Sequence, residues 1–249
     1  MAKKLSANIL RGRKCAFCGS YRTYRLADER VKCGKCKKRY SLAKLAKDLE
    51  ILHYFALEIS ANRTSRELNL SYKTVSSRYM FFRERIAEYE EKTFHKLSGE
   101  LELDETYFGG KRKGKRGRGA LNKAIVFGVL ERNGKVYTTV VPDVTAATLM
   151  KEIEEKTEKG SVFYTDCFKS YGSLRRFGKH SRVNHEKTFG RGRNHINGLE
   201  GFWSFAKERF HKYHGIDREN YPWYLKEMEF RYNHRNVDMF KKLITIIFQ

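Results

Sequence analysis

The sequence has little proline and no long apolar run. Only two prolines occur among 249 residues, so no proline-rich linker separates its parts. No stretch of about eighteen consecutive apolar residues is present, and the sequence therefore predicts no membrane-spanning helix. The segment from Met1 to Arg13 is basic but lacks the apolar core of a secretory signal. We therefore expect a cytoplasmic protein.

Acidic residues are scarce relative to basic ones. The chain carries 52 Lys and Arg against 29 Asp and Glu, a formal net charge of +23. This excess is larger than solubility requires and predicts a polyanionic partner, for which nucleic acid is the usual candidate. Charge alone does not separate a DNA-binding protein from one that coats RNA. Apolar residues make up 40% of the chain, enough for one catalytic domain and a small N-terminal module.

Cysteines are few, but four of the five occur as two close pairs. Two residues separate Cys15 from Cys18 and Cys33 from Cys36, and fourteen residues lie between the pairs. This spacing lets four thiolates face one tetrahedral Zn²⁺, and in a reducing compartment it indicates a metal site rather than disulfides. So short a module buries little core, so the metal would supply its folding energy. We expect the fifth, Cys167, to be a buried core residue.

Three segments follow one another along the chain. We expect a zinc ribbon over residues 1–40, a helical segment over 41–98, and a catalytic domain with a C-terminal helix over 99–249. In the last of these, a meander of strands with a hairpin turn at Asn133–Gly134 precedes β/α alternation, which predicts an α/β fold with a mixed sheet and flanking helices. Strands are expected at 100–108, 123–131, 135–141, 161–165 and 181–185, and helices at 145–158, from about 197, and at 221–233.

The helical segment contains a sequence that resembles a helix-turn-helix. Apolar residues recur at helical spacing on both sides of a polar turn. We expect a short helix to end near Leu68 and Ser71 to cap the next one, with Val75 packed inward. The start of the second helix, including Lys73 and Arg78, would then face the major groove of DNA. A small helical hairpin without a role in DNA binding is the alternative.

Three acidic residues each have two interpretations. Asp104 lies on a strand face that alternation fills with acids, a face that is either exposed to solvent or bound to a cation. Asp166 ends an apolar strand at the sheet edge where α/β proteins bind ligands, and it could equally cap the next helix. On the expected helix from about 197, Ile196, Leu199, Trp203 and Ala206 form an apolar stripe. Glu200 belongs to the neighbouring polar stripe from Asn197 to Lys207, which is either solvated or able to bind a metal ion and the adjacent phosphate.

Together these residues resemble the catalytic triad of DDE transposases, which have a ribonuclease H-like fold. Asp166 and Glu200 are 34 residues apart, as is typical of those enzymes, and Lys207 follows Glu200 by seven. The similarity to one bacterial insertion-sequence subgroup, whose members carry an N-terminal zinc ribbon, is closer still. It extends over Asp-Glu-Thr-Tyr-Phe-Gly-Gly (104–110), Tyr-Thr-Asp (164–166), Asn-Gly-Leu-Glu-Gly-Phe-Trp-Ser-Phe-Ala-Lys (197–207) and Glu-Phe-Arg-Tyr-Asn-His-Arg (229–235).

The resemblance implies metal-dependent cleavage of DNA strands and their transfer at the ends of the element. Asp104, Asp166 and Glu200 would hold two divalent cations, Mg²⁺ or Mn²⁺, about 4 Å apart. Asn197 lies on the same helix face as Glu200 and competes with it as the third ligand. Lys207 would contact phosphate near the scissile bond.

Further residues are candidates for the site and for DNA binding. Glu105 and His185 are second-tier candidates for the site. From 111 to 123 the chain has seven basic residues and no acidic ones, which predicts either a flexible solvated loop or a clamp on the DNA backbone. The expected contacts in that segment are Lys111, Arg112, Lys113, Lys115 and Arg116.

The expected partners are double-stranded DNA, as terminal inverted repeats and as target, and a second copy of the chain, because transposition joins two ends. In a bacterial cell the protein would then lie with the nucleoid. Two other functions stay open. One is a non-catalytic DNA-binding regulator built from the zinc ribbon and the helix-turn-helix. The other is a ribonuclease H-like nuclease that cuts without joining.

Overall fold

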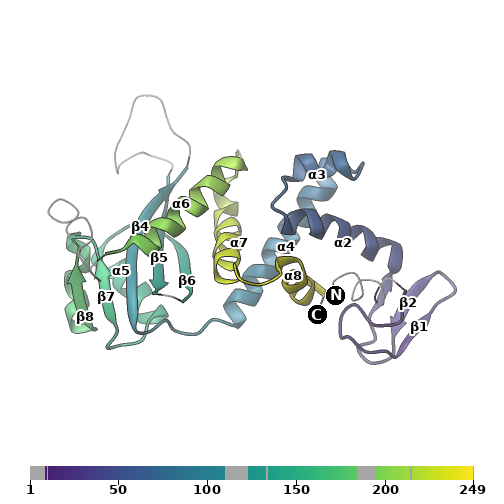
Figure 1. Ribbon diagram of the computed structural model, residues 1–249, viewed down its shortest axis with the longest axis horizontal. Helices are drawn as coiled ribbons and strands as arrows, with labels where there is room; N and C mark the ends of the chain where they lie inside the picture. Colours follow the sequence, from purple (N-terminus) through teal and green to yellow (C-terminus); the bar gives the residue numbers. More distant parts are fainter. Residues whose placement is uncertain are drawn as a thin grey trace. The chain divides into compact units, whose positions relative to one another are not determined.

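The computed structural model describes residue 9 and residues 11–109, 123–132, 134–183, 195–213 and 215–248. Residues 1–89 and 234–249 form one compact unit, and residues 90–233 form another; Figure 1 shows the elements of each. Residues 234–249, which we grouped with the catalytic domain, thus belong to the first unit, while the boundaries after residues 40 and 98 stay predictions. Of the helices described, none is both long enough and apolar enough to cross a bilayer.

A small antiparallel sheet lies near the start of the first unit. Its strands, in spatial order, are β1 (Thr23–Arg25), β2 (Arg30–Cys33) and β3 (Arg39–Ser41). Val31 at its centre is fully buried. Strands of three or four residues nevertheless bury too little apolar surface to stay folded without a further constraint. Because Cys33 ends β2, this sheet shares a residue with the cysteine cluster described below.

The helical part of the first unit has the predicted helix-turn-helix form. It contains α2 (Leu42–Ala56), α3 (Ala61–Glu67), α4 (Tyr72–Lys92) and α8 (Met239–Phe248). The Oγ of Ser71 accepts a hydrogen bond from the Thr74 N–H at 3.1 Å, which confirms the predicted cap of α4. Val75 is fully buried, as expected.

An aromatic cluster packs α2 against α4. The ring centroid of Phe55 lies 4.9 Å from that of Tyr79 and 5.5 Å from that of Phe82. The Tyr79 hydroxyl donates to the Ile59 carbonyl at 2.9 Å and also lies 2.9 Å from the Thr64 hydroxyl. A buried phenol needs such a partner. The apolar faces predicted from the helical spacing are therefore confirmed.

A five-stranded mixed sheet forms the centre of the second unit. Its strands, in spatial order, are β6 (Val136–Val141), β5 (Ala124–Glu131), β4 (Glu100–Phe108), β7 (Val162–Thr165) and β8 (Lys179–Arg182). The strands β4, β5 and β6 form an antiparallel meander, and β7 and β8 run parallel to β4. The predicted α/β class with a mixed sheet is confirmed. The last strand begins and ends earlier than the expected range 181–185.

Helices cover both faces of this sheet. One face carries α6 (Asn197–Lys212), the short η2 (Arg218–Asn220) and α7 (Tyr221–Asn233); the other carries α5 (Ala146–Lys156) and the 3₁₀ helix η1 (Lys169–Arg176). Alternation along β4 decides which side chain meets which helix. Leu101 and Leu103 pack beneath α5 and η1, whereas Phe108 packs beneath α6. Figure 1 shows α6 lying across β4 and β5.

The segment after β7 differs from the prediction. We expected Cys167 to be buried, but it is exposed. The reason is that β7 ends at Thr165 and the chain turns at Asp166, so the cysteine lies outside the sheet. The helix that follows is a 3₁₀ helix and begins at Lys169.

Side chains of α7 form hydrogen bonds with backbone groups of the edge strand β6. The Asn233 Oδ1 accepts from the Val136 N–H at 2.8 Å, and its Nδ2 donates to the Val136 carbonyl at 2.9 Å. The Glu229 carboxylate accepts from the N–H and the hydroxyl of Thr138, both at 2.8 Å. The backbone groups bonded in this way are not open to pairing with another chain. This explains the Glu-Phe-Arg-Tyr-Asn run at 229–233 as the part of α7 that holds the helix on the sheet.

Candidate active site

Asp104 lies in the middle of β4, on the face covered by α6. The indole Nε1 of Trp203 donates to its Oδ2 at 3.1 Å. Burial raises the pKa of Asp104 to about 7, and the carboxylates of Glu105 and Asp166 act in the same direction. A carboxyl group that is partly buried beside other acids is stabilised in its charged form by a cation. The predicted alternative of a strand face open to solvent is wrong, because α6 covers it.

The parallel pairing of β4 and β7 brings Asp166 next to Asp104. Residues 100, 101 and 102 of β4 pair with residues 162, 163 and 164 of β7. Two positions further along are Asp104 on β4 and Asp166, the first residue after β7, and the Asp166 carboxylate helps to raise the pKa of Asp104. The Asp166 Oδ1 accepts from the Phe168 N–H at 2.9 Å. One oxygen thus caps the following turn, and capping and ligation are compatible.

Glu105 points to the opposite face of the sheet. Its Oε2 accepts a hydrogen bond from the Tyr171 hydroxyl at 2.6 Å, and Tyr171 is fully buried. Burial, followed by the Glu105 carboxylate, raises the pKa of Tyr171 well above its ordinary value. The phenol therefore stays protonated and donates. This second-tier candidate is held beneath the site rather than within it.

Helix α6 carries the remaining acid of the predicted site. Its buried stripe contains Leu199, Trp203 and Ala206, as predicted, and its exposed stripe contains Glu200 and Lys207. Trp203 lies one turn after Glu200 and reaches Asp104, so α6 crosses β4 at the candidate site. Desolvation lowers the pKa of the Lys207 ammonium, and the carboxylate of Asp104 opposes that shift.

A glycine on the neighbouring strand allows this close crossing. Gly128 pairs with Asp104 across β4 and β5. A Cβ at this position would lie 2.5 Å from the Trp203 Cζ2, too close for any side chain. The indole ring therefore occupies the space above Gly128, with its N–H directed at the carboxylate.

The structure brings Asp104 and Asp166 together but does not gather all three predicted acids into one tight group. Over the ranges that the structure describes, the four paired cysteines alone bring three or more His, Cys, Asp or Glu ligand atoms within 4.8 Å of one another. Glu200 lies on the exposed side of α6. Carboxylate oxygens are the donors that Mg²⁺ and Mn²⁺ prefer, so the paired aspartates suit a divalent cation.

The paired cysteines form a second candidate metal site, in the first unit. The Sγ atoms of Cys15 and Cys36 are 3.7 Å apart, and those of Cys18 and Cys33 are 3.5 Å apart. Four sulfurs around a Zn²⁺ ion, each at about 2.3 Å, would be separated by roughly 3.8 Å. The cluster therefore fits tetrahedral zinc, and zinc would have a structural role with all four positions filled by protein.

Equivalent tight turns present the two cysteine pairs. Gly19 and Lys37 follow the second cysteine of each pair, with left-handed φ angles of 67° and 63°. Their N–H groups donate to the Cys15 and Cys33 carbonyls at 3.1 and 3.0 Å. Backbone N–H groups, that of Cys36 above all, lower the pKa of the Cys33 thiol to about 6, whereas burial raises that of Cys15 to about 12. A bound cation would stabilise the thiolate form of each.

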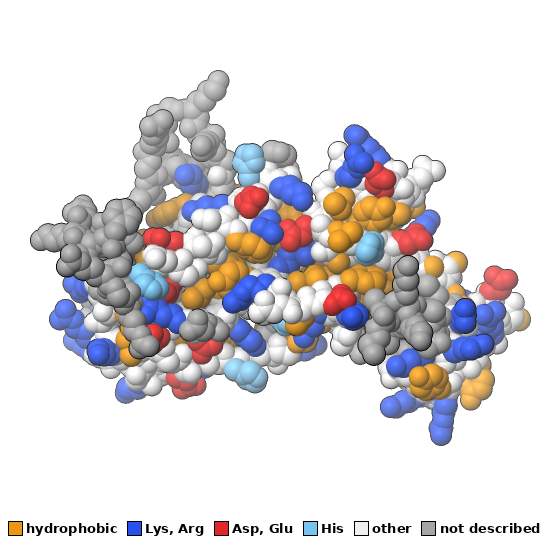
Figure 2. Space-filling view, viewed as in Figure 1, with side chains coloured by type: hydrophobic (Ala, Val, Ile, Leu, Met, Phe, Trp, Pro, Cys, Tyr) orange, Lys and Arg blue, Asp and Glu red, His pale blue; other side chains and the backbone are white. Residues whose placement is uncertain are grey.

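Basic and aromatic side chains are exposed on the same small sheet. Figure 2 shows Lys and Arg side chains gathered over the β1–β3 part of the chain. Tyr21 and Tyr24 are 72% and 59% exposed, and the Lys14 Nζ lies 5.7 Å from the centre of the Tyr21 ring. Cations of this kind can pair with phosphates, and exposed rings can stack on bases.

The two predicted DNA contacts on α4 differ in their surroundings. Lys73 is exposed in the first turn. The Arg78 Nε lies 2.9 Å from the Asp48 Oδ1, its Nη2 donates to Oδ2 at 3.0 Å, and its guanidinium stacks on Phe81. Arg78 thus fastens α4 to α2. The other predicted residues, Lys111, Arg112, Lys113, Lys115, Arg116 and His185, lie outside the described residues.

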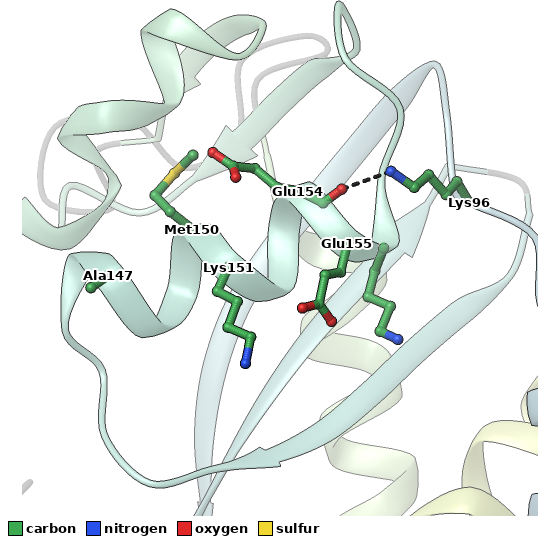
Figure 3. Close-up of a pocket in the computed structure, with 7 residues that line it drawn as sticks. Lys96, Ala147, Met150, Lys151, Glu154 and Glu155 are labelled. Carbon is green, nitrogen blue, oxygen red and sulfur yellow. Dashed lines mark hydrogen bonds between the residues drawn. The ribbon is translucent and has the colours of Figure 1, made fainter.

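A shallow depression beside α5 lies on the opposite face of the sheet from Asp104. It has a volume of about 700 Å³ and is lined by Lys96, Ala147, Met150, Lys151, Glu154, Glu155 and Lys156. Figure 3 shows the Lys96 ammonium donating to the Glu154 carbonyl, at 2.8 Å. Leu149 and Ile153 of the same helix pack against the face that holds Leu101 and Leu103. The depression therefore contains no part of the acidic site.

Sequence reasoning missed three partners of the acids: Trp203, Tyr171 and Arg132. We placed Trp203 in an apolar stripe, and its indole N–H is the polar handle that a buried Trp must satisfy. Arg132 makes an ion pair with Glu102, described below. None of the three partnerships has a local sequence signal, because each joins residues that are distant along the chain.

Comparison with known proteins identifies the family of this chain. The ISXO2-like transposase domain matches residues 96–233, more than half of the chain. An uncharacterized transposase-like protein of Haemophilus influenzae is 44% identical over 117 residues, which are 46% of this chain and 92% of the relative. An uncharacterized protein in the transposable element ISH50 of Halobacterium salinarum is 24% identical over 243 residues, 86% of this chain and 80% of that protein. The chain therefore belongs to the ISXO2-like family of DDE transposases.

Solved structures show weaker similarities. The match to the catalytic core domain of BIV integrase extends over 56% of this chain and 86% of the integrase chain, with 14% identity and a TM-score of 0.37. The match to the Mos1 strand transfer complex extends over 80% of this chain and 74% of the Mos1 chain, with 14% identity and a TM-score of 0.33. At such scores neither similarity assigns a reaction.

Proposed function

We propose that the chain is an insertion-sequence transposase that cleaves DNA at the ends of its element and transfers the strands to target DNA. The adjacency of Asp104 and Asp166 on parallel strands, beneath the helix that carries Glu200, is the observation that supports this most strongly. These three carboxylates would hold Mg²⁺ or Mn²⁺. When bound, the cations activate an attacking hydroxyl and stabilise the leaving oxygen.

The proposed reaction has two phosphoryl-transfer steps. Water first cleaves a phosphodiester bond at the element end and leaves a 3′-hydroxyl. That hydroxyl then attacks a phosphate of the target DNA, forming one P–O bond as the bond to the target's 3′-oxygen breaks. Trp203 holds the Asp104 carboxylate in one orientation, and Lys207 contacts a phosphate next to the scissile bond.

The third ligand is proposed to be Glu200, with Asn197 as its competitor. Both are exposed and lie one turn apart on α6. A carboxylate binds a divalent cation more strongly than an amide does, because it contributes charge. We therefore assign Glu200 as the ligand and Asn197 as a neighbour that contacts the substrate.

Double-stranded DNA is the proposed partner, as terminal repeat and as target. Residues 1–40 and 41–98 would recognise it through the basic face of the zinc ribbon and the start of α4, and residues 99–249 would carry the chemistry. Lys73 would contact the major groove or its flanking phosphates. Residues 111–116 would bind the backbone, and two copies of the chain would join the two ends.

The test is a cleavage and joining assay on a duplex ending in the terminal repeat that brackets the reading frame. We expect Asp104→Asn and Asp166→Asn to lose about a thousandfold or more of the Mg²⁺-dependent rate, since a metal ligand stabilises the transition state by several kcal/mol. The rate of the Glu200→Gln variant should fall by a similar factor, and that of the Asn197→Ala variant by a smaller one. Glu208→Gln, an exposed acid on the same helix, is the matched control and should react like the parent.

The other two functions would give different results in this assay. A DNA-binding regulator would shift the duplex in a gel but would leave it uncut with either metal. A nuclease would cut but yield no joined product. Parent-like cutting and joining by all three carboxylate variants would show that the assigned site is wrong.

A further inference from the structure

Glu102 lies two residues before Asp104 on β4, but its surroundings are different. Its side chain is 1% exposed, beneath the start of α6. The Leu199 N–H donates to its Oε2 at 2.9 Å, and the Arg132 Nε donates to its Oε1 at 3.0 Å. The His195 Nδ1 lies 3.5 Å from the same Oε1. Both carboxylate oxygens therefore have protein partners, and Glu102 is not placed to bind a catalytic cation.

Glu102 takes the place of a local N-cap for α6. Ile196, at the N-cap position, has no side-chain hydrogen bond to the first turn. The first N–H groups of a helix need an acceptor and favour a negative charge. Here a strand supplies that acceptor. Gly198 permits the approach, because a Cβ there would lie 2.9 Å from the Glu102 Oε2.

Arg132 extends this contact to two more segments. Its Nη2 donates to the His195 carbonyl at 2.5 Å, on the chain entering α6. Its guanidinium stacks on the Tyr164 ring of β7, at 3.7 Å from the ring centre, and its Nη1 lies 3.4 Å from the Glu100 carboxylate. Arg132 is only 11% exposed. One buried side chain thus contacts β4, β7 and the start of α6.

Glu102, Arg132 and the residues that they contact, Tyr164 and Leu199 among them, form one cluster. Each of the three proposed metal ligands follows a member of this cluster in sequence. Asp104 is two residues after Glu102, Asp166 two residues after Tyr164, and Glu200 directly after Leu199. Strands β4 and β7 are paired in the sheet, and the Glu102–Arg132 pair contacts both strands and the start of α6.

We infer that Glu102 and Arg132 are positioning residues that fix the helix carrying Glu200 relative to the paired strands that lead to Asp104 and Asp166. This inference rests on the proposed function. Glu102 would determine where α6 begins and how the helix is rotated about its axis. Arg132 would determine the distance between the start of α6 and β7. A buried ion pair bonded to three segments has a single favourable arrangement. The ligands would then be held in place before the metal binds.

The test measures Mn²⁺ binding by the full-length, zinc-loaded protein, separately from its reaction with DNA. Mn²⁺ is titrated while the fluorescence of Trp203 is followed in a Trp223→Phe background, and plasmid nicking in Mn²⁺ is measured in parallel. We expect Glu102→Gln to weaken Mn²⁺ binding about tenfold, the lower end of what loss of a partner to metal ligands costs. Glu131→Gln makes the same charge change on β5, outside the cluster, and should bind Mn²⁺ like the parent.

Two further variants test whether the residues act together. Arg132→Gln should weaken Mn²⁺ binding to a similar extent. The double variant Glu102→Gln/Arg132→Gln should be little weaker than either single one, because residues that act as one unit are not additive. Thermal unfolding of each variant shows that the protein is folded at the temperature of the titration.

Different results would refute the inference and the proposed function. If Glu102→Gln only lowers the melting temperature, and the folded variant binds Mn²⁺ and nicks DNA like the parent, the pair is merely structural. If Asp104→Asn also binds Mn²⁺ and nicks DNA like the parent, the assigned metal site itself is wrong. Loss of binding in Asp104→Asn with parent-like Glu102→Gln removes only the positioning role.

Discussion

The indole N–H of Trp203 and the carboxylate of Asp104 lie 3.1 Å apart and join the helix of the candidate site to its central strand. The two residues are 99 positions apart in the chain. The bond fixes the orientation of the Asp104 carboxylate. It also explains why an aromatic residue with a donor, rather than Phe, occupies this place in the buried stripe of α6.

Replacing Trp203 by Phe should therefore lower the rate of metal-dependent cleavage. Phe fills most of the apolar space but cannot donate, and a hydrogen bond to a charged group contributes about 1.5–3 kcal/mol, or at least about tenfold in rate. The measurement is cleavage of the terminal-repeat duplex across a range of Mg²⁺ concentrations. Trp223→Phe removes the other tryptophan, which is 36% exposed, and serves as the control. An unchanged rate for Trp203→Phe would mean that Asp104 does not need this donor.

Removing one cysteine ligand should unfold the small N-terminal sheet. We expect Cys33→Ser to abolish zinc binding, because the oxygen of serine is a poor substitute for a thiolate, and the three short strands lose their main constraint. Zinc content by mass spectrometry and protease sensitivity near residues 20–40 give the readout. Cys167→Ser changes an exposed cysteine and should retain one zinc. A Cys33→Ser protein that keeps its zinc would contradict the assignment.

Loss of the amide at Asn233 should destabilise the second unit. Asn233→Ala removes two hydrogen bonds to Val136 and exposes part of the edge strand β6. We expect a loss of about 1–3 kcal/mol in the free energy of unfolding and a greater tendency to aggregate, measured by urea unfolding and light scattering. Asn236→Ala, at an exposed position nearby, should cost much less. If both variants lost the same free energy of unfolding, the hydrogen bonds to β6 would not be the source of the loss.

Lys73 should contribute to DNA binding through phosphate. We expect Lys73→Ala to weaken binding to a terminal-repeat duplex and to reduce the slope of log affinity against log salt concentration by about one. Fluorescence anisotropy at several salt concentrations measures both. Lys169→Ala, an exposed lysine at the start of η1, is the charge-matched control. If both variants shift the salt dependence equally, the start of α4 has no particular role.

Glu90 should make stability depend on pH. Burial, followed by the Glu229 carboxylate, raises its pKa from 4.5 to about 7, although Lys226 and Lys135 oppose the shift. The folded protein therefore binds a proton more tightly than the unfolded chain, and stability falls as the pH rises from about 4.5 to 7. Above that window, Glu90→Gln should stabilise the protein by about 1–2 kcal/mol, after allowance for screening by solvent.

Urea unfolding at pH 5 and pH 8 tests this expectation. At pH 5 most of the difference between Glu90→Gln and the parent should disappear, because the folded parent is then largely protonated at Glu90. The exposed Glu91 on the same helix gives the control Glu91→Gln, which should match the parent at both values. A constant difference at the two pH values would exclude Glu90 as its source.

Much of the fold was predictable from local patterns. Alternation along residues 100–108 gave the two faces of β4 correctly, and helical spacing gave the buried stripe of α6. The prediction for Cys167 was wrong because the end of β7 depends on where its neighbours stop pairing. Local spacing also could not show that α8 packs in the first unit, since an apolar helix face predicts burial without naming its partner.

By itself, the sequence determined the two cysteine pairs, the strand and helix types, and the order of Asp104, Asp166 and Glu200, because these follow from residue spacing over short stretches. Tertiary structure alone decided that Asp104 and Asp166 are neighbours, that Trp203 reaches the first of them, and that Glu102 serves α6 instead of a cation. Those relationships depend on strand register and helix packing. They bring together residues tens of positions apart, for which no local pattern exists.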